Sequence, residues 1–199
     1  MNARAMVKRQ RIQAVVIGAS AGGVDALLKL LSGLPASFGL PVVVVLHLAE
    51  DRDSQLAEIF RNHTLMEVRE AADKESLAPG TLYFAPPGYH LLIEKEHSFS
   101  LSSEAPVNFS RPSIDVLMES AADAYGAHLA GILLTGANAD GAAGLAKIGQ
   151  QGGLAVVQDP AEAQMPTMPE AAIRQRQPDL ILDLKSIRSL LLEMGKNSC

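Results

Sequence analysis

Apolar residues in this chain occur in short runs that alternate with segments of helical period. Nine runs have the length of strands, and they lie at about 13–19, 41–47, 66–70, 81–85, 90–94, 98–102, 128–135, 153–158 and 179–183. Six segments between them repeat apolar residues every three or four positions, at about 22–33, 51–62, 112–125, 141–151, 168–176 and 185–195. Because such alternation is typical of βαβ units, we expect an α/β fold built on a mainly parallel sheet.

Two of the runs indicate how the sheet is covered. Residues 15–17 and 42–46 are apolar at every position instead of at alternate ones, as expected for central strands with helices on both faces. The pattern therefore predicts a doubly wound, three-layer αβα sheet of Rossmann type. Short runs between 81 and 102 are separated by turn residues, which indicates an antiparallel ribbon at one edge.

Length and composition favour one domain. The 199 residues are 48% hydrophobic and contain no long linker, so we expect a flexible leader at 1–12, one folded domain at 13–195 and a tail at 196–199. The longest apolar run, 40–46, is too short to cross a bilayer, and no secretory pattern opens the chain. We therefore expect a cytoplasmic protein without membrane insertion.

Two kinds of partner are disfavoured by the composition. Cys199 is the only cysteine, so neither a disulfide framework nor a thiolate metal site is expected. The formal charge of −5 and the lack of clustered basic and aromatic residues argue against nucleic-acid binding. Neither a metal nor a nucleic acid is therefore an expected partner.

Ser20 lies in a Gly-x-Ser-x-Gly turn, from Gly18 to Gly22, directly after an apolar run. A tight turn of this type holds a hydroxyl out of the path of the chain, where a base can reach it. Ser20 is thus a candidate nucleophile. One other interpretation fits the same residues: a glycine-rich turn whose N–H groups hold a phosphate, in which the serine only caps the next helix.

A histidine and an aspartate also follow predicted parallel strands. His47 ends the run 42–46, and Asp140 follows the run that ends near Thr135. Since the carboxyl ends of parallel strands meet where the strand order reverses, we expect Ser20, His47 and Asp140 to converge there. They would serve as nucleophile, base and the carboxylate that orients the base. Asp140 fits equally well an ordinary N-cap of the helix after it, and four further histidines compete with His47, namely His63, His90, His97 and His128.

Six motifs occur in the order found in a known family. They are 18–23 (GASAGG), the strand that ends in His47, 83–86 (YFAP), 111–115 (RPSID), 135–141 (TGANADG), and 157–159 (VQD) with 168–169 (MP). Together they resemble the catalytic domain of the chemotaxis protein-glutamate methylesterases, of CheB type. The resemblance runs from about residue 13 to about residue 192.

The resemblance implies a serine hydrolase that removes methyl groups from glutamate γ-methyl esters of chemoreceptors, releases methanol and often deamidates selected glutamines. The nucleophile, base and orienting acid of the family match Ser20, His47 and Asp140. Its backbone oxyanion donor matches Ala137, and the N–H of Ala21 is a candidate second donor. No cofactor is expected.

The resemblance also implies a protein partner, the cytoplasmic helices of methyl-accepting chemoreceptors. Arg111 and Ser113 are candidates for guiding such a helix, although this segment fits equally well the plain start of a helix. Many members of the family carry an N-terminal receiver domain, for which this sequence has no room before Ala14. We therefore expect either a stand-alone esterase, with a separate receiver protein as a candidate partner, or a fragment of a longer protein.

The chain departs from the family pattern near two motifs. The usual Thr-Gly-Met-Gly-x-Asp-Gly loop has Ala137 and Asn138 at its third and fourth positions, and Ser110 stands where many relatives have histidine. The altered loop keeps open a non-catalytic module that binds signalling proteins with a relic of the triad. The glycines of 18–23 keep open a dinucleotide-binding protein, although Val24 replaces the third glycine of that motif.

Overall fold

The structure is a computed structural model, and it describes residues 11–47 and 55–196. Its strands are β1 (Ala14–Ala19), β2 (Val42–Leu46), β3 (Glu67–Glu70), β4 (Thr81–Phe84), β5 (His90–Ile93), β6 (Phe99–Ser102), β7 (Leu129–Leu133), β8 (Leu154–Gln158) and β9 (Leu180–Leu182). Its helices are α2 (Gly23–Leu31), α3 (Leu56–Arg61), α4 (Ile114–Tyr125), α5 (Ala142–Gln150), α6 (Thr167–Gln175) and α7 (Leu184–Lys196), with a short 3-10 helix, η1 (Gly126–His128). Each element predicted from the apolar pattern has a counterpart among them.

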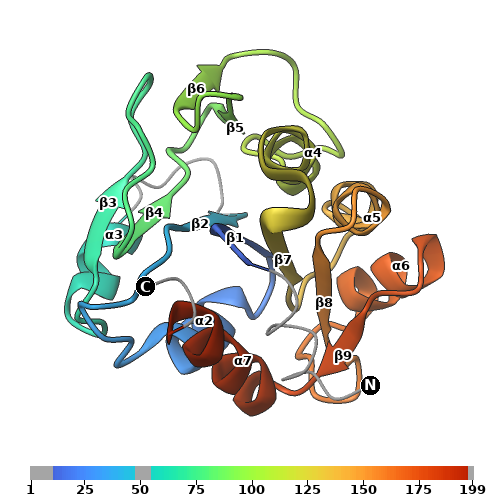
Figure 1. Cartoon of the computed structure of the whole chain (residues 1–199). Coiled ribbons are helices and arrows are strands. Elements are labelled where there is room, and N and C mark those ends of the chain that lie inside the picture. Colours follow the sequence, from blue (N-terminus) through green and yellow to red (C-terminus); the bar gives the residue numbers. More distant parts are fainter. Residues whose placement is uncertain (1–10, 48–54, 197–199) are drawn as a thin grey trace.

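Seven strands form one sheet in the order β3-β4-β2-β1-β7-β8-β9, and each neighbouring pair is parallel. The predicted fold class, a doubly wound α/β sheet between helical layers, is confirmed (Figure 1). The antiparallel ribbon is present as β5 and β6, but it forms a sheet of its own and does not join the edge of the main sheet. It packs against α4 instead, because Leu91, Ile93 and Phe99 of the ribbon contribute to the core on that side.

Successive side chains of the central strands point to opposite faces of the sheet, and both faces are buried. Val15 and Ile17 of β1 join the core formed with α2, α3 and α7, whereas Ala14 and Val16 join the core formed with α4, α5 and α6. Figure 1 shows α2 beside α7 on one side of the sheet and α4 beside α5 on the other. Burial on both faces explains why these strands are apolar at consecutive positions.

The strand order reverses between β1 and β7, so a topological switch point lies at the carboxyl ends of these strands. Ser20 follows β1, and His47 follows β2, in which Leu46 is paired with Ala19. The Ser20 N–H donates to the Thr135 carbonyl over 3.0 Å, and the His47 N–H donates to the Ala19 carbonyl over 3.1 Å. Backbone hydrogen bonds therefore hold the three strand ends together.

The turn after Ser20 requires glycine at two positions. Gly22, the N-cap of α2, has a φ of 78°, in the left-handed region that residues with a Cβ rarely adopt. Gly23 begins α2 where a Cβ would lie 2.5 Å from Cδ1 of Leu46 and 2.8 Å from Cβ of Ala19. The two glycines let α2 start directly beside the ends of β1 and β2. Ser20 therefore lies at the carboxyl ends of the parallel strands.

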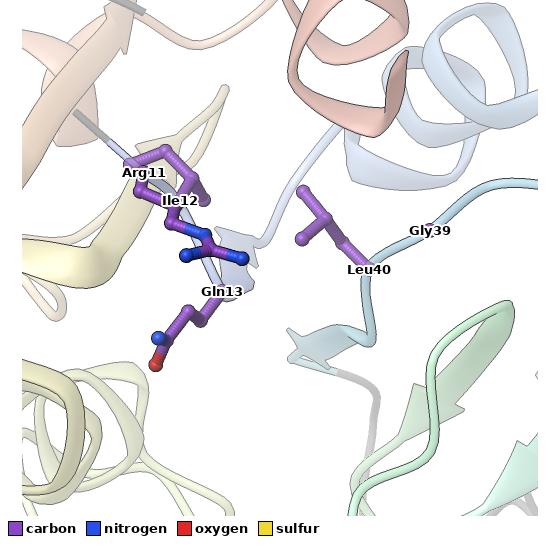
Figure 2. Close-up of a pocket in the computed structure, with 5 residues that line it drawn as sticks. All are labelled: Arg11, Ile12, Gln13, Gly39 and Leu40. Atoms are coloured by element: carbon purple, nitrogen blue, oxygen red, sulfur yellow. The ribbon is translucent and has the colours of Figure 1, made fainter. Parts of the chain in front are cut away.

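A pocket of about 300 Å³ lies on the side of the sheet where the strands begin, away from Ser20 and His47 (Figure 2). The residues that line it are Arg11, Ile12, Gln13, Gly39 and Leu40. They precede β1 and β2 and therefore lie at the amino ends of the strands, whereas the predicted site lies at the carboxyl ends.

Three predicted segments lie wholly or partly outside the described residues: the leader at 1–12, the tail at 196–199 and the first part of the helix at 51–62. The extent of the folded domain, 13–195, stays a prediction. Over the ranges 11–47 and 55–196, no helix is both long enough and apolar enough to span a bilayer.

We expect Gly131→Val to destabilise the fold. Gly131 lies in β7 beneath α5, where a Cβ would come within 2.5 Å of Cδ1 of Ile148 and 2.9 Å of Cδ1 of Leu145. Overpacking a buried position typically costs about 1–3 kcal/mol, which urea unfolding will measure as a lower midpoint. The control is Ala161→Val, which adds two methyl groups at an exposed loop residue and should leave the midpoint unchanged. Equal midpoints for Gly131→Val and the parent would show that α5 can move away from β7 without cost.

Candidate active site

The structure brings His47 and Asp140 together. Nε2 of His47 lies 2.8 Å from Oδ2 of Asp140, although the two residues are 93 positions apart in the sequence. They follow β2 and β7, the two strands that flank β1. The carboxylate is fully buried and the imidazole is 11% exposed, so the pair reaches the surface only through the imidazole.

Four further groups donate hydrogen bonds to the Asp140 carboxylate. They are the Ile114 N–H (2.7 Å), the Asp115 N–H (3.1 Å), the Ser113 hydroxyl (2.8 Å) and the Asn108 side-chain amide (3.1 Å). Asp140 therefore lies at the N-terminus of α4, where unpaired N–H groups and the helix dipole favour a negative charge. The interpretation of Asp140 as the N-cap of the following helix is wrong, because Gly141 holds that position in α5.

These donors decide the charge of Asp140. Burial on its own favours the neutral acid, but the hydrogen bonds from His47 and from the start of α4 outweigh it and lower the pKa of Asp140 to about 2. An ionised Asp140 accepts a hydrogen bond from the proton on Nε2, so the neutral imidazole carries its lone pair on Nδ1. Nδ1 is therefore the atom of His47 that can take a proton.

The structure pairs Nδ1 with a serine that was not predicted for this role. The Ser110 hydroxyl lies 3.4 Å from Nδ1 of His47 and donates to it, which is a long hydrogen bond. The Ser20 hydroxyl makes no hydrogen bond to His47 or to any other described residue. The hydrogen bond that the predicted triad needs between Ser20 and His47 is therefore not formed in this structure.

Ser20 is partly exposed at the end of β1, and it does not cap α2. The N-cap is Gly22, and among the described residues no side chain makes a capping hydrogen bond to α2, so the interpretation of Ser20 as a helix cap is wrong. A Cβ at Gly136 would come within 3.0 Å of Cβ of Ser20, so the loop after β7 lies directly against the serine.

Ala137 and Ala21 are both exposed, and among the described residues neither of their N–H groups meets an acceptor. Two unpaired backbone donors thus belong to residues beside Ser20.

Arg111 and Ser113, the candidates for guiding a substrate, hold the protein itself. Ser113 is fully buried, donates to Oδ1 of Asp140 and caps α4, so it is not open to a protein substrate. Arg111 donates from Nη1 to the carbonyls of Ser103 and Glu104, over 3.1 Å in each case. Ser113 is instead the N-cap of α4, in agreement with the alternative interpretation of this segment as the start of a helix.

Asn108 and Asp115 belong to the site although no pattern in the sequence assigns them a role there. The Asn108 amide donates to Oδ2 of Asp115 (2.8 Å) as well as to Asp140, and Oδ1 of Asp115 accepts the N–H of Gly144 in α5 (2.7 Å). Burial raises the pKa of Asp115 to about 6, with the charge of Asp140 adding to the effect against the hydrogen bond from Gly144. No spacing along the chain connects an asparagine in a loop with these two carboxylates, so only the fold reveals its part.

The altered loop before Asp140 keeps a polar contact with it. Oδ1 of Asn138 accepts the N–H of Asp140 over 3.2 Å. Asn138 is not among the described residues with positive φ, so its side chain requires no strained backbone. The departure of this loop from the family pattern therefore leaves the backbone N–H of Ala137 in place.

The four histidines that compete with His47 all bond to backbone carbonyls. His63, His90, His97 and His128 contact the carbonyls of Ile59, Ala105, Ala124 and Arg11. Of the five histidines, His47 is the one that bonds to Asp140. In the part of the chain that the structure describes, no group of three His, Cys, Asp or Glu side chains is placed to hold a metal ion.

A doubly wound parallel sheet with a histidine–aspartate pair beside a serine turn defines an α/β protein of hydrolase type. The model of the CheB methylesterase family matches residues 15–191. This chain therefore belongs to the CheB methylesterase family.

Individual relatives agree with that assignment. A protein of Leptospira interrogans, named for protein-glutamate methylesterase and protein-glutamine glutaminase activity, is 47% identical over 186 residues, which are 94% of this chain and 96% of that protein. A protein of Anaeromyxobacter dehalogenans named for the same activities is 38% identical over 96% of this chain, which spans 56% of that longer protein. The crystal structure of the Thermotoga maritima CheB methylesterase catalytic domain has a TM-score of 0.87 and 31% identity, and covers 92% of this chain and 98% of that domain.

Membership of this family places the chain among the methylesterase and glutaminase hydrolases. It favours the hydrolase interpretation over both alternatives, the non-catalytic binding module and the dinucleotide-binding protein. Neither the family model nor these relatives indicates which residues carry the reaction in this chain, so that assignment depends on the geometry of the site.

We expect Asp115→Asn to reduce the pH dependence of the free energy of unfolding. The folded protein holds the Asp115 proton up to about pH 6, whereas an unperturbed aspartate releases it near 3.8. The stability contributed by this group is therefore present at low pH and is lost as the pH rises through about 6. Between pH 4.5 and pH 7 the loss amounts to about 2 kcal/mol. Urea unfolding at both pH values will measure a smaller drop in Asp115→Asn than in the parent.

Glu104→Gln is the control for this measurement, because it removes an exposed carboxylate at a loop residue. Its drop in stability between the two pH values should equal that of the parent. If Asp115→Asn also keeps the full drop, Asp115 does not hold a proton in the folded state near pH 5.

Proposed function

We propose that this protein is a serine hydrolase that cleaves glutamate γ-methyl esters of chemoreceptors and releases methanol. The observation that carries the proposal is the 2.8 Å bond between His47 and the buried, ionised Asp140, formed at the strand end next to Ser20. An imidazole oriented by a carboxylate beside a serine is the arrangement that activates a hydroxyl for acyl transfer. The names of the family and its relatives support a methyl ester of a protein glutamate as the substrate, and the resemblance to the chemotaxis methylesterases supports the chemoreceptor.

In the proposed reaction, Oγ of Ser20 attacks the ester carbonyl carbon and gives its proton to Nδ1 of His47. The proton then passes to the departing methoxide, so methanol leaves and an acyl-enzyme on Ser20 remains. Water attacks the acyl group with His47 again as base, which releases the glutamate side chain and restores the serine. Asp140 stabilises the imidazolium in both halves of the reaction. A glutamine substrate would release ammonia by the same steps.

Nδ1 has to exchange Ser110 for Ser20 before the first step. The Ser110 contact is long, at 3.4 Å, so little bonding is lost when it breaks. Ser20 and His47 follow paired neighbouring strands, which are spaced about 5 Å apart. We propose that a rotation of side chains, with the backbone in place, completes the triad when substrate binds, because catalytic hydrogen bonds commonly tighten at that stage.

The proposed oxyanion donors are the N–H groups of Ala137 and Ala21. Both residues lie beside Ser20, and their N–H groups meet no acceptor in the described part of the chain. Donors of this kind typically lower the barrier by about 3 kcal/mol each. Because the donor is a backbone group, the replacement of the family's methionine by Ala137 keeps it.

The proposed substrate region is the cytoplasmic helical part of a methyl-accepting chemoreceptor, which makes the cytoplasm the proposed location. A separate receiver protein is a further proposed partner. The proposed steps use only side chains, backbone N–H groups and water, and need no cofactor.

Ser20→Ala should abolish methanol release from a methylated receptor fragment. Loss of the nucleophile lowers kcat by more than about ten-thousandfold in serine hydrolases. A fluorophosphonate probe should label the parent at Ser20 and should label neither Ser20→Ala nor His47→Ala. Gas chromatography of the methanol and mass spectrometry of the labelled peptide give the two measurements.

Ser110→Ala is the matched control, since it removes the same atom from the other serine near His47. We expect this variant to keep its labelling and to release methanol. Labelling that survives in Ser20→Ala and disappears in Ser110→Ala would make Ser110 the nucleophile and overturn the assignment. A parent protein that the probe leaves unlabelled would favour the non-catalytic module.

A further inference from the structure

A tight turn at residues 107–110 lies directly beside the proposed catalytic residues. Val107 and Ser110 exchange both backbone hydrogen bonds, at 3.1 and 2.9 Å. Asn108 and Phe109 between them have φ values of 51° and 62°, in the left-handed region. Asparagine tolerates this conformation, whereas a phenylalanine there is uncommon and strained. Strained backbone of this kind is concentrated at functional sites.

Side chains on both sides of Phe109 bond to the site. Asn108 donates to Asp115 (2.8 Å) and to Asp140 (3.1 Å). Ser110 donates to Nδ1 of His47 (3.4 Å). Phe109 therefore has a defined position next to the proposed base, because each of its neighbours in the chain is attached to a catalytic side chain.

The side chain of Phe109 is exposed to solvent. Its exposure is 103%, so the fold shields none of it from water, and it is the most exposed of the large apolar side chains in the described part of the chain. A single exposed apolar residue is ordinary on a protein surface. This one is distinguished by a backbone that is held in an unfavourable conformation beside the site.

A second exposed apolar side chain lies on the Ser20 side of the site. Met165 is 37% exposed, and its carbonyl accepts the N–H of Gly136 over 3.0 Å. Gly136 lies against Ser20, because a Cβ added to this glycine would be 3.0 Å from that of Ser20. Phe109, whose neighbour Ser110 bonds to His47, and Met165, whose carbonyl bonds to the loop beside Ser20, are therefore both exposed apolar residues near the reacting groups.

We propose that Phe109, together with Met165, is an apolar anchor for the protein substrate and sets its affinity without taking part in the chemistry. This inference rests on the proposed function. The occupant is a receptor helix whose glutamyl methyl ester enters the site and whose apolar side chains, three or four positions from the ester, cover the Phe109 ring. Residues at this spacing lie on the same face of a helix as the ester.

Charge supports apolar recognition over an ionic one. The esterified glutamate is neutral, and this chain carries a formal charge of −5, which does not attract an acidic helix. The arginine next to the turn, Arg111, is bonded to the carbonyls of Ser103 and Glu104. A substrate helix therefore meets the Phe109 ring beside the base, next to an arginine whose Nη1 is already bonded within the protein.

Phe109→Asn tests the anchor, because asparagine keeps the left-handed turn and removes the ring. On a methylated receptor fragment we expect KM to rise about tenfold, the loss typical of an exposed aromatic contact at an interface, with kcat changed less than twofold. Hydrolysis of p-nitrophenyl acetate, which lacks the receptor helix that the anchor holds, should keep its rate. Phe109→Tyr should restore most of the affinity, because it keeps an aromatic ring.

Leu65→Ala is the control, since Leu65 is 71% exposed and lies before β3, at the amino edge of the sheet. Its KM on the receptor fragment should equal that of the parent. An unchanged KM in Phe109→Asn, or an equal loss on p-nitrophenyl acetate, would overturn the anchor and leave the proposed function standing. A parent that hydrolyses p-nitrophenyl acetate but releases no methanol from the receptor fragment would overturn the proposed substrate and the anchor together.

Discussion

The buried charge of Asp140 is the constraint around which this site is built. A carboxylate that is cut off from water stays ionised only when hydrogen-bond donors replace the solvent. Asp140 obtains its donors from His47, from Asn108 and from the first residues of α4. Because these donors come from three separate parts of the chain, satisfying one charge also determines where the imidazole, the 107–110 turn and α4 lie relative to one another.

The sheet provides the place where this charge can be satisfied. At the switch point, the loop after β7 passes close to both the end of β1 and the start of α4. Two glycines make that approach possible: a Cβ at Gly18 would collide with Ile114, and a Cβ at Gly141 would lie 2.6 Å from Cγ2 of the same residue. The first residue of α4 can therefore press against the end of β1, from where its N–H reaches Asp140 over 2.7 Å.

The parts of the structure that depend on patterns along the chain could be predicted from the sequence. Consecutive apolar residues in β1 and β2 indicated strands covered on both faces, and the regular spacing of apolar residues indicated the helices. Ser20, His47 and Asp140 could be singled out because each follows a parallel strand, and the carboxyl ends of such strands meet at one edge of the sheet. The edge ribbon was predicted less well, since periodicity shows that two strands pair but not which sheet they join.

The surroundings of Asp140 could not be predicted, because they depend on which helix N-terminus faces the carboxylate. In the sequence, Asp140 comes just before α5 and resembles its cap, yet Gly141 takes that place with a φ of 92°. The carboxylate turns to α4 instead, whose first residue lies 26 positions earlier in the chain. In the same way, Ser110 and Ser20 could both be noted in the sequence, but not that Ser110 would occupy the imidazole nitrogen that Ser20 needs. Which of two serines meets the base depends on tertiary contacts, and in this protein the base itself is held by the buried charge of Asp140.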